Sequence, residues 1–137
     1  MLPETIRSLI LDEHARQEHR FLDDVDLDEY LAKLSSKAEI LSDSAEDRCR
    51  GFVAFYCNDQ EIKQAFITLV LVDPRDRHLG IGRALVKCVM DLAKRRGFAS
   101  CRLEVAKRNE VARAMYLSLG FRVVDDHGHK ELLEVVL

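Results

Sequence analysis

The sequence predicts an α/β fold with a mixed, mostly antiparallel central sheet of about six to seven strands and helices on both faces. Segments with helical spacing of apolar residues alternate with short runs rich in Phe, Val, Ile and Tyr. The runs 51–57 and 66–72 are apolar at odd and even positions alike, so both faces of the sheet should be covered. The length of 137 residues, 47% of them apolar, fits a single domain over residues 1–137.

The first half predicts two helices followed by three strands. Residues 4–20 and 28–36 have helical spacing, with an acidic turn at 23–26 between them. Strands are expected over 38–41, 51–57 and 65–72, separated by turn-like residues at 42–44 and 58–60. These short connections predict a three-stranded meander.

The second half predicts two helices and three strands. The clearest helix has the apolar stripe Ile81, Leu85, Cys88, Val89 and Leu92 and ends at Gly97. A strand is expected over 101–105, and a helix over 110–119 has Asn109 as its N-cap and Gly120 just past its end. Strands over 121–125 and 131–137 flank a turn at 127–129. Because the last strand is apolar to its final residue, it is either inserted in the sheet or paired with a second subunit. The sequence is therefore compatible with a homodimer.

Several functional classes are disfavoured by composition. No apolar run approaches the roughly 18 residues of a membrane span, and no signal-peptide pattern follows Met1, so a cytoplasmic protein without membrane contact is expected. The four cysteines form no C-x-x-C pair and are expected to be reduced and mostly buried. His14 and His19 are five residues apart, and 127–129 is typical of a turn, so no metal is predicted.

Charge is unevenly distributed along the chain. Residues 1–72 carry a net charge of −7, residues 73–122 carry +7 and residues 123–137 carry −3. A basic block inside an acidic protein suits a small phosphorylated ligand better than a nucleic acid, and no nucleic-acid partner is expected. The acidic residues of 23–29 could attract a cationic substrate, although a solvated surface is the simpler interpretation.

A strand that stops at a glycine-containing turn opening a helix is the strongest chemical signal. Val70-Leu71-Val72-Asp73-Pro74 is followed by Arg77-His78-Leu79-Gly80-Ile81-Gly82-Arg83 at the start of the clearest helix. Free amides at a helix N-terminus, with glycines that allow close approach, favour a pyrophosphate. A lone G-x-G also occurs for steric reasons alone. The third glycine of a dinucleotide fingerprint and the Gly-Lys-Ser/Thr of a P-loop are both missing.

With this motif the sequence resembles the GNAT superfamily of acetyl-CoA-dependent N-acetyltransferases. The family signature [Gln/Arg]-x-x-Gly-x-[Gly/Ala] after a Val-x-Pro strand end is matched by Arg77, Gly80 and Gly82 after Val72-Asp73-Pro74. A second signature matches Leu103-Glu104-Val105, Asn109, Ala112, Tyr116 and Gly120-Phe121. The resemblance extends from about residue 51 to residue 121 and implies a GNAT-like fold. Relatives usually begin with a strand, whereas residues 4–20 look helical from the start.

The resemblance also implies an activity, the transfer of an acetyl group from acetyl-CoA to a primary amine of a small molecule or a peptide. Tyr116 would be the general acid that protonates the departing thiolate, and Glu104 would be the general base, as proposed for some relatives that acetylate protein N-termini. Groups expected to bind the cosubstrate are Val70, Leu71 and Val72 at the pantetheine arm, Arg77, His78, Leu79, Gly80, Ile81, Gly82 and Arg83 at the pyrophosphate, and Asn109.

Each role has a simpler alternative. Tyr116 lies on a helical face with Met115 and Leu119 and would otherwise be a core tyrosine. Glu104 lies in an alternating strand, where a solvated carboxylate is common, and Asn109 can be a helix cap alone. A domain that binds acyl-CoA without turnover, as a sensor or a partner-binding module, is the alternative function. The identity of the amine acceptor stays open.

Overall fold

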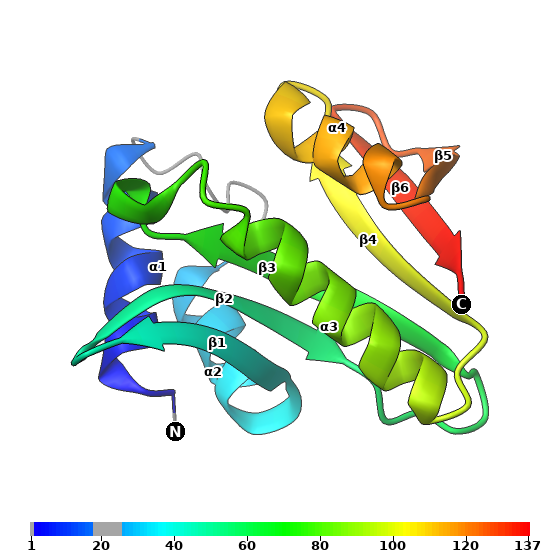
Figure 1. The fold of residues 1–137 in the computed structure, drawn as a ribbon, viewed down its shortest axis with the longest axis horizontal. Helices are drawn as coiled ribbons and strands as arrows, with labels where there is room; N and C mark the ends of the chain where they lie inside the picture. Colours follow the sequence, from blue (N-terminus) through cyan, green and yellow to red (C-terminus); the bar gives the residue numbers. More distant parts are fainter. Residues whose placement is uncertain (1, 18–25) are drawn as a thin grey trace.

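The computed structural model describes residues 2–17 and 26–137 and contains one six-stranded sheet in the order β1-β2-β3-β4-β6-β5 (Figure 1). Only β3 and β4 pair in parallel, so the predicted mixed, mostly antiparallel sheet is confirmed. The elements are α1 (Glu4–Arg16), α2 (Leu27–Lys37), β1 (Glu39–Ala45), β2 (Arg48–Tyr56), β3 (Gln64–Val72), the 3₁₀ turn η1 (Pro74–Asp76), α3 (Ile81–Arg95), β4 (Ser100–Ala106), α4 (Glu110–Ser118), β5 (Arg122–Asp126) and β6 (Lys130–Val136).

Helices cover both faces of the sheet, as the apolar strands predict. On one face, Ile10 of α1 and Leu34 of α2 pack with Phe52 of β2, all at most 1% exposed. On the other face, Val86 and Val89 of α3 belong to a core that reaches across to β4, β6 and Phe121. The core under α1 and α2 includes residues of β2 and β3 but none of β4, β5 or β6. Among the described residues, no helix packs on that face of the β4-β6-β5 half of the sheet, and it is called the uncovered face below.

Two boundaries differ from the sequence prediction. The turn predicted at 42–44 is wrong, because Asp43 pairs with Gly51 within β1 and the reversal comes at Glu46, which has a φ of 57°. Polar residues fit there because β1 is an edge strand with one exposed side, and the Asp43 carboxylate accepts a hydrogen bond from Arg50 Nε at 2.7 Å. Helix α1 ends at Arg16, and residues 18–25, which include most of the predicted acidic turn, lie outside the described residues.

The remaining elements confirm the prediction to within a few residues at their ends. In the described part of the chain no strand precedes α1, as the helical spacing from residue 4 predicts. Strand β6 is inserted between β4 and β5, which accounts for the burial of Leu133 and Val135. Cys49, Cys57 and Cys101 are buried free thiols, whereas Cys88 is exposed. Among the described residues, no helix is long and apolar enough to cross a membrane.

Candidate functional site

Strands β3 and β4 separate partway along their length and leave one edge of β3 open. They pair only from Gln64–Ser100 to Ile67–Leu103, while β3 continues to Val72 (Figure 1). Along residues 68–72 the strand pairs only with β2 on its other side. Within the described residues, main-chain groups on the β4 side of this stretch therefore have no strand partner. The predicted pantetheine-binding residues Val70, Leu71 and Val72 lie in this stretch.

The middle of β3 is irregular and is contacted by a tyrosine from α2. The β2-β3 register shifts between Ala54 and Phe55, which leaves Thr68 as the extra residue on β3. The Tyr30 hydroxyl donates to the carbonyl oxygen of Thr68 at 3.2 Å and lies 3.0 Å from its Oγ1. Burial raises the pKa of Tyr30 to about 12, so this hydroxyl stays protonated at neutral pH. Sequence reasoning missed Tyr30, because nothing local in α2 indicates that it reaches β3.

The turn from β3 to α3 presents backbone amides. His78 has a φ of 66° and Gly80, the N-cap of α3, has a φ of 79°, so the chain passes twice through the left-handed region. No side chain caps α3, and its first backbone hydrogen bond runs from the amide of Ala84 to the oxygen of Gly80 at 3.0 Å. In the described chain, the amides of Ile81, Gly82 and Arg83 have no protein acceptor. With the positive end of the helix dipole, these amides form a site that favours an anion.

Glycine 82 lets this turn lie close to neighbouring elements. A Cβ at that position would lie 3.6 Å from Val72 Cγ2, 3.8 Å from Val70 Cγ1 and 3.9 Å from Met115 Sδ. These contacts leave room for a methyl group but not for a larger side chain. Arg83 donates to the Ser118 hydroxyl and thereby links the first turn of α3 to the end of α4. The predicted pyrophosphate residues from His78 to Arg83 thus form one turn between the open end of β3 and α4, exposed except at Ile81 and Gly82.

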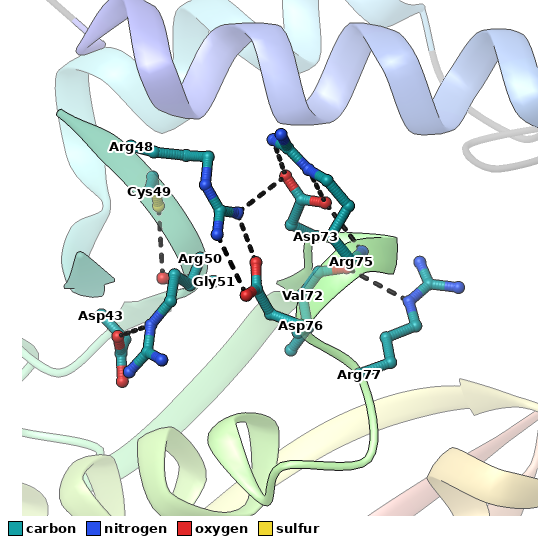
Figure 2. Close-up of polar contacts among 10 residues, drawn as sticks. All are labelled: Asp43, Arg48, Cys49, Arg50, Gly51, Val72, Asp73, Arg75, Asp76 and Arg77. Atoms are coloured by element: carbon teal, nitrogen blue, oxygen red, sulfur yellow. Dashed lines mark hydrogen bonds and ion pairs between the residues drawn. The ribbon is translucent and has the colours of Figure 1, made fainter. Parts of the chain in front are cut away.

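A network of buried carboxylates and arginines holds the segment before this turn (Figure 2). Both terminal nitrogens of Arg48, in β2, donate hydrogen bonds to the Asp76 carboxylate, and one of them also donates to Asp73 at 3.5 Å. Arg75 forms a second bidentate ion pair, in which its Nε and Nη2 donate to the two Asp73 oxygens at 3.1 and 2.8 Å. Asp73 and Asp76 are only 5% and 7% exposed. Sequence reasoning missed this network, because Arg48 is 28 residues from Asp76 and carries no local signal.

These contacts shift the pKa values of both carboxyl groups. Hydrogen bonds from Arg75 lower the pKa of Asp73 to about 2, against a smaller opposing effect of burial. The hydrogen bond from Arg48 lowers the pKa of Asp76. Asp73 also accepts the backbone amide of Arg75 at 2.9 Å, which caps η1. Both groups are carboxylates at neutral pH, and they tie η1 to β2.

The side chain of Arg77 is engaged away from the predicted pyrophosphate turn. Its Nε donates to the Val72 carbonyl at 3.2 Å, and its terminal nitrogen lies 3.0 Å from Glu13 Oε1 of α1. Burial raises the pKa of Glu13, but hydrogen bonds from Gln17 and Arg16 together with the charge of Arg77 outweigh it, so the net shift is downward. Arg77 thus joins the end of β3 to α1, and its predicted contact with pyrophosphate stays a prediction.

Tyr116 lies in α4 and Asn109 is its N-cap. The position of each residue is compatible with a structural role and with the role that the family resemblance implies. Tyr116 is 7% exposed and meets the Phe121 ring edge to face, with centroids 5.8 Å apart. Burial raises its pKa to about 12, and its hydroxyl has no hydrogen bond to the described residues. Asn109 caps α4 by accepting the Ala112 amide at 3.4 Å. The structure thus places a protonated tyrosine in the core between α4 and the sheet.

Glu104 lies on the face of β4 that none of the described helices covers. Its neighbours Leu103 and Val105 are buried on the α3 side, whereas the Glu104 side chain is 38% exposed. Its Oε2 is 2.7 Å from His127 Nδ1, and His127 Nε2 is 3.2 Å from Asp125 Oδ2. Sequence reasoning treated residues 127–129 as a turn and missed this contact. In the described residues, no group of three or more His, Cys, Asp or Glu side chains is arranged so that it could hold a metal ion.

Comparison with known proteins agrees with this geometry. Residues 4–121 match the model described as Acetyltransferase (GNAT) family, which is most of the chain. The chain belongs to this family. A GNAT relative, the [ribosomal protein bS18]-alanine N-acetyltransferase of Escherichia coli strain K12, is 38% identical over 68 residues, which are 50% of this chain and 46% of that protein. The match therefore spans about half the length of that curated relative.

Solved protein structures share this fold. The PaiA N-acetyltransferase of Thermoplasma acidophilum, solved in complex with coenzyme A, is 22% identical with a TM-score of 0.68, over 100% of this chain and 81% of that one. PH1933 from Pyrococcus horikoshii OT3 is 19% identical with a TM-score of 0.80, over 100% and 94% of the two chains. The GNAT-like fold expected from the two sequence signatures is confirmed.

Proposed function

We propose that this chain is an acetyl-CoA-dependent N-acetyltransferase whose acceptor is the N-terminal amine of a protein. The observation that carries the proposal is the continuity of the open β3 edge with the unpartnered amides at the start of α3. An extended arm with amide groups can pair with an open strand edge, and a diphosphate suits the N-terminus of a helix. Coenzyme A has both parts, and the PaiA structure was solved with coenzyme A.

The residues present fit this cosubstrate. Val70, Leu71 and Val72 would hold the pantetheine arm, and the amides from His78 to Arg83 would hold the pyrophosphate. The exposed side chain of Arg83 adds positive charge. Asn109 would add a contact from the start of α4. Acetyl-CoA supplies the activated acetyl group, and the chain supplies binding, orientation and proton transfer.

The reaction needs a base for the amine and an acid for the thiolate. An amine attacks only after losing a proton, and a thiolate with a pKa of about 8.5 leaves more readily when it is protonated. Tyr116, with a pKa of about 12, keeps its proton at neutral pH and would donate it. Glu104 would accept the proton of the amine, directly or through a water, from the uncovered face of β4. A backbone amide near Leu71 would stabilise the developing oxyanion.

The choice of a protein N-terminus rests on the curated relative, which acetylates the alanine of a ribosomal protein according to its name.

The proposal is tested by thiol release from acetyl-CoA over a panel of acceptors, with calorimetry of coenzyme A binding in parallel. The panel contains peptides with free N-terminal Ala, Ser and Met, the same peptides N-terminally acetylated, a polyamine and an aminoglycoside. We expect turnover with free peptides and none with the blocked ones. Binding without turnover would favour the acyl-CoA sensor instead, and absence of coenzyme A binding would refute both functions.

A further inference from the structure

Three side chains form a hydrogen-bonded chain across the uncovered face of the sheet. Glu104 comes from β4, Asp125 from β5 and His127 from the turn between β5 and β6. The two ring nitrogens of His127 face the two carboxylates, at 2.7 Å from Glu104 and 3.2 Å from Asp125. All three side chains are at least 38% exposed, so none of them belongs to the core.

The strand register explains why an imidazole bridges these two carboxylates. Leu132 of β6 pairs with Glu104 on one side and with Asp125 on the other. The two acidic residues are therefore two strand spacings apart, about 10 Å between backbones, and point to the same face. His127, from the turn that follows β5, lies between the two carboxylates and contacts both of them.

The geometry favours the protonated form of His127. An ionised carboxylate only accepts hydrogen bonds, and only the imidazolium form of the ring donates from both nitrogens at once. In support, the hydrogen bond to Glu104, and to a lesser degree that to Asp125, raises the pKa of His127. Other charged or titratable groups nearby are Asp126, which is paired with Lys107 at 2.8 Å, and His129 and Lys130 on the same hairpin.

We propose that His127 is a positioning residue for Glu104 in acetyl transfer. By holding Oε2, the imidazolium fixes the orientation of the Glu104 carboxylate, whose Oε1 has no hydrogen bond to the described residues. Oε1 is then directed to the acceptor amine or its water. The positive ring also separates the negative charges of Glu104 and Asp125, which would otherwise repel each other. This inference rests on the proposed function, because it names His127 as the residue that positions Glu104, the base of that reaction.

A double-mutant cycle tests whether His127 acts through Glu104. We expect His127→Ala to lower kcat about ten-fold, within the roughly 2- to 150-fold range typical of contacting residues. Coenzyme A affinity and the melting temperature should stay unchanged, since neither coenzyme-binding residues nor the core are touched. In a Glu104→Gln background the same change should alter kcat less than two-fold. His129→Ala, in the same turn, is the matched control and should retain wild-type kcat.

Additive effects of His127→Ala and Glu104→Gln, or an unchanged kcat in His127→Ala, would overturn the proposal. A lower melting temperature that accounts for the lost rate would also count against it. The KM for the peptide and kcat are measured separately, because loss of orientation lowers kcat whereas a defect in the hairpin as a peptide-binding surface raises KM.

Nuclear magnetic resonance separates failure of this inference from failure of the proposed function. In ¹⁵N-labelled wild-type protein at neutral pH, both ring nitrogens of His127 should be protonated. In Glu104→Gln, the titration midpoint of His127 should fall. A neutral ring at neutral pH, or a midpoint insensitive to Glu104, would end the inference even if acetyl transfer is observed. Absence of turnover with every acceptor would end the proposed function, and the positioning role with it.

Discussion

The substitution Asp73→Asn tests whether the network of arginines and carboxylates in Figure 2 stabilises η1, the segment before the turn from β3 to α3. Asparagine can still accept the Arg75 amide and cap η1, but it loses the charge and the Oδ2 acceptor of Arg75 and Arg48. A fall in the carboxyl pKa from 3.8 to about 2 corresponds to about 2 kcal/mol of stability at neutral pH. Arg75 is 68% exposed and screened by water, so we expect a loss of about 1 to 2 kcal/mol.

The sign of the pH dependence follows from the lowered pKa. The stabilisation is fully present above the unfolded value of about 4 and is lost as the pH falls through about 2. The difference in unfolding free energy between wild type and Asp73→Asn should therefore shrink at pH 2.5 to roughly a third of its value at pH 7. Urea unfolding followed by circular dichroism at both pH values measures it. An equal difference at the two pH values, or none at pH 7, would refute the electrostatic explanation.

Three further predictions follow from the site. Tyr116→Phe should lower kcat by roughly 10² to 10⁴ and leave the melting temperature unchanged, because the ring still packs on Phe121; unaltered turnover would refute the acid role. Gly82→Leu should weaken coenzyme A binding in calorimetry by at least about ten-fold, because the loss of one hydrogen bond to a charged group has about this effect. Gly82→Ala should bind coenzyme A nearly normally, because a methyl group fits there. Gly51→Ala should cost about 1 to 3 kcal/mol in urea unfolding, because the new Cβ would lie 3.1 Å from Ile81 Cγ2 and 3.2 Å from the Leu71 oxygen; full stability would show that β2 can shift.

Local patterns predicted most of the fold. The apolar stripe of α3, the Asn109 cap of α4 and the apolar character of β2 and β3 depend on residues close in sequence, and the structure confirms each of them. The turn predicted at 42–44 failed because an edge strand tolerates polar residues that are also typical of turns. The 3₁₀ turn η1 was missed, although Asp73-Pro74 is a suitable start for one.

For the candidate site, the sequence by itself determined where an anion can meet the backbone. Gly80 acts through a left-handed conformation that a short segment adopts by its own sterics, whereas the need for Gly82 comes from neighbours in β3 and α4. Only the tertiary structure decided the partners of the charged side chains. Arg77 meets Glu13, Arg48 meets Asp76, and Glu104 meets His127, each across at least 23 residues of chain. Such pairs depend on strand register and on the packing of α1 against the sheet, and these are properties of the whole chain.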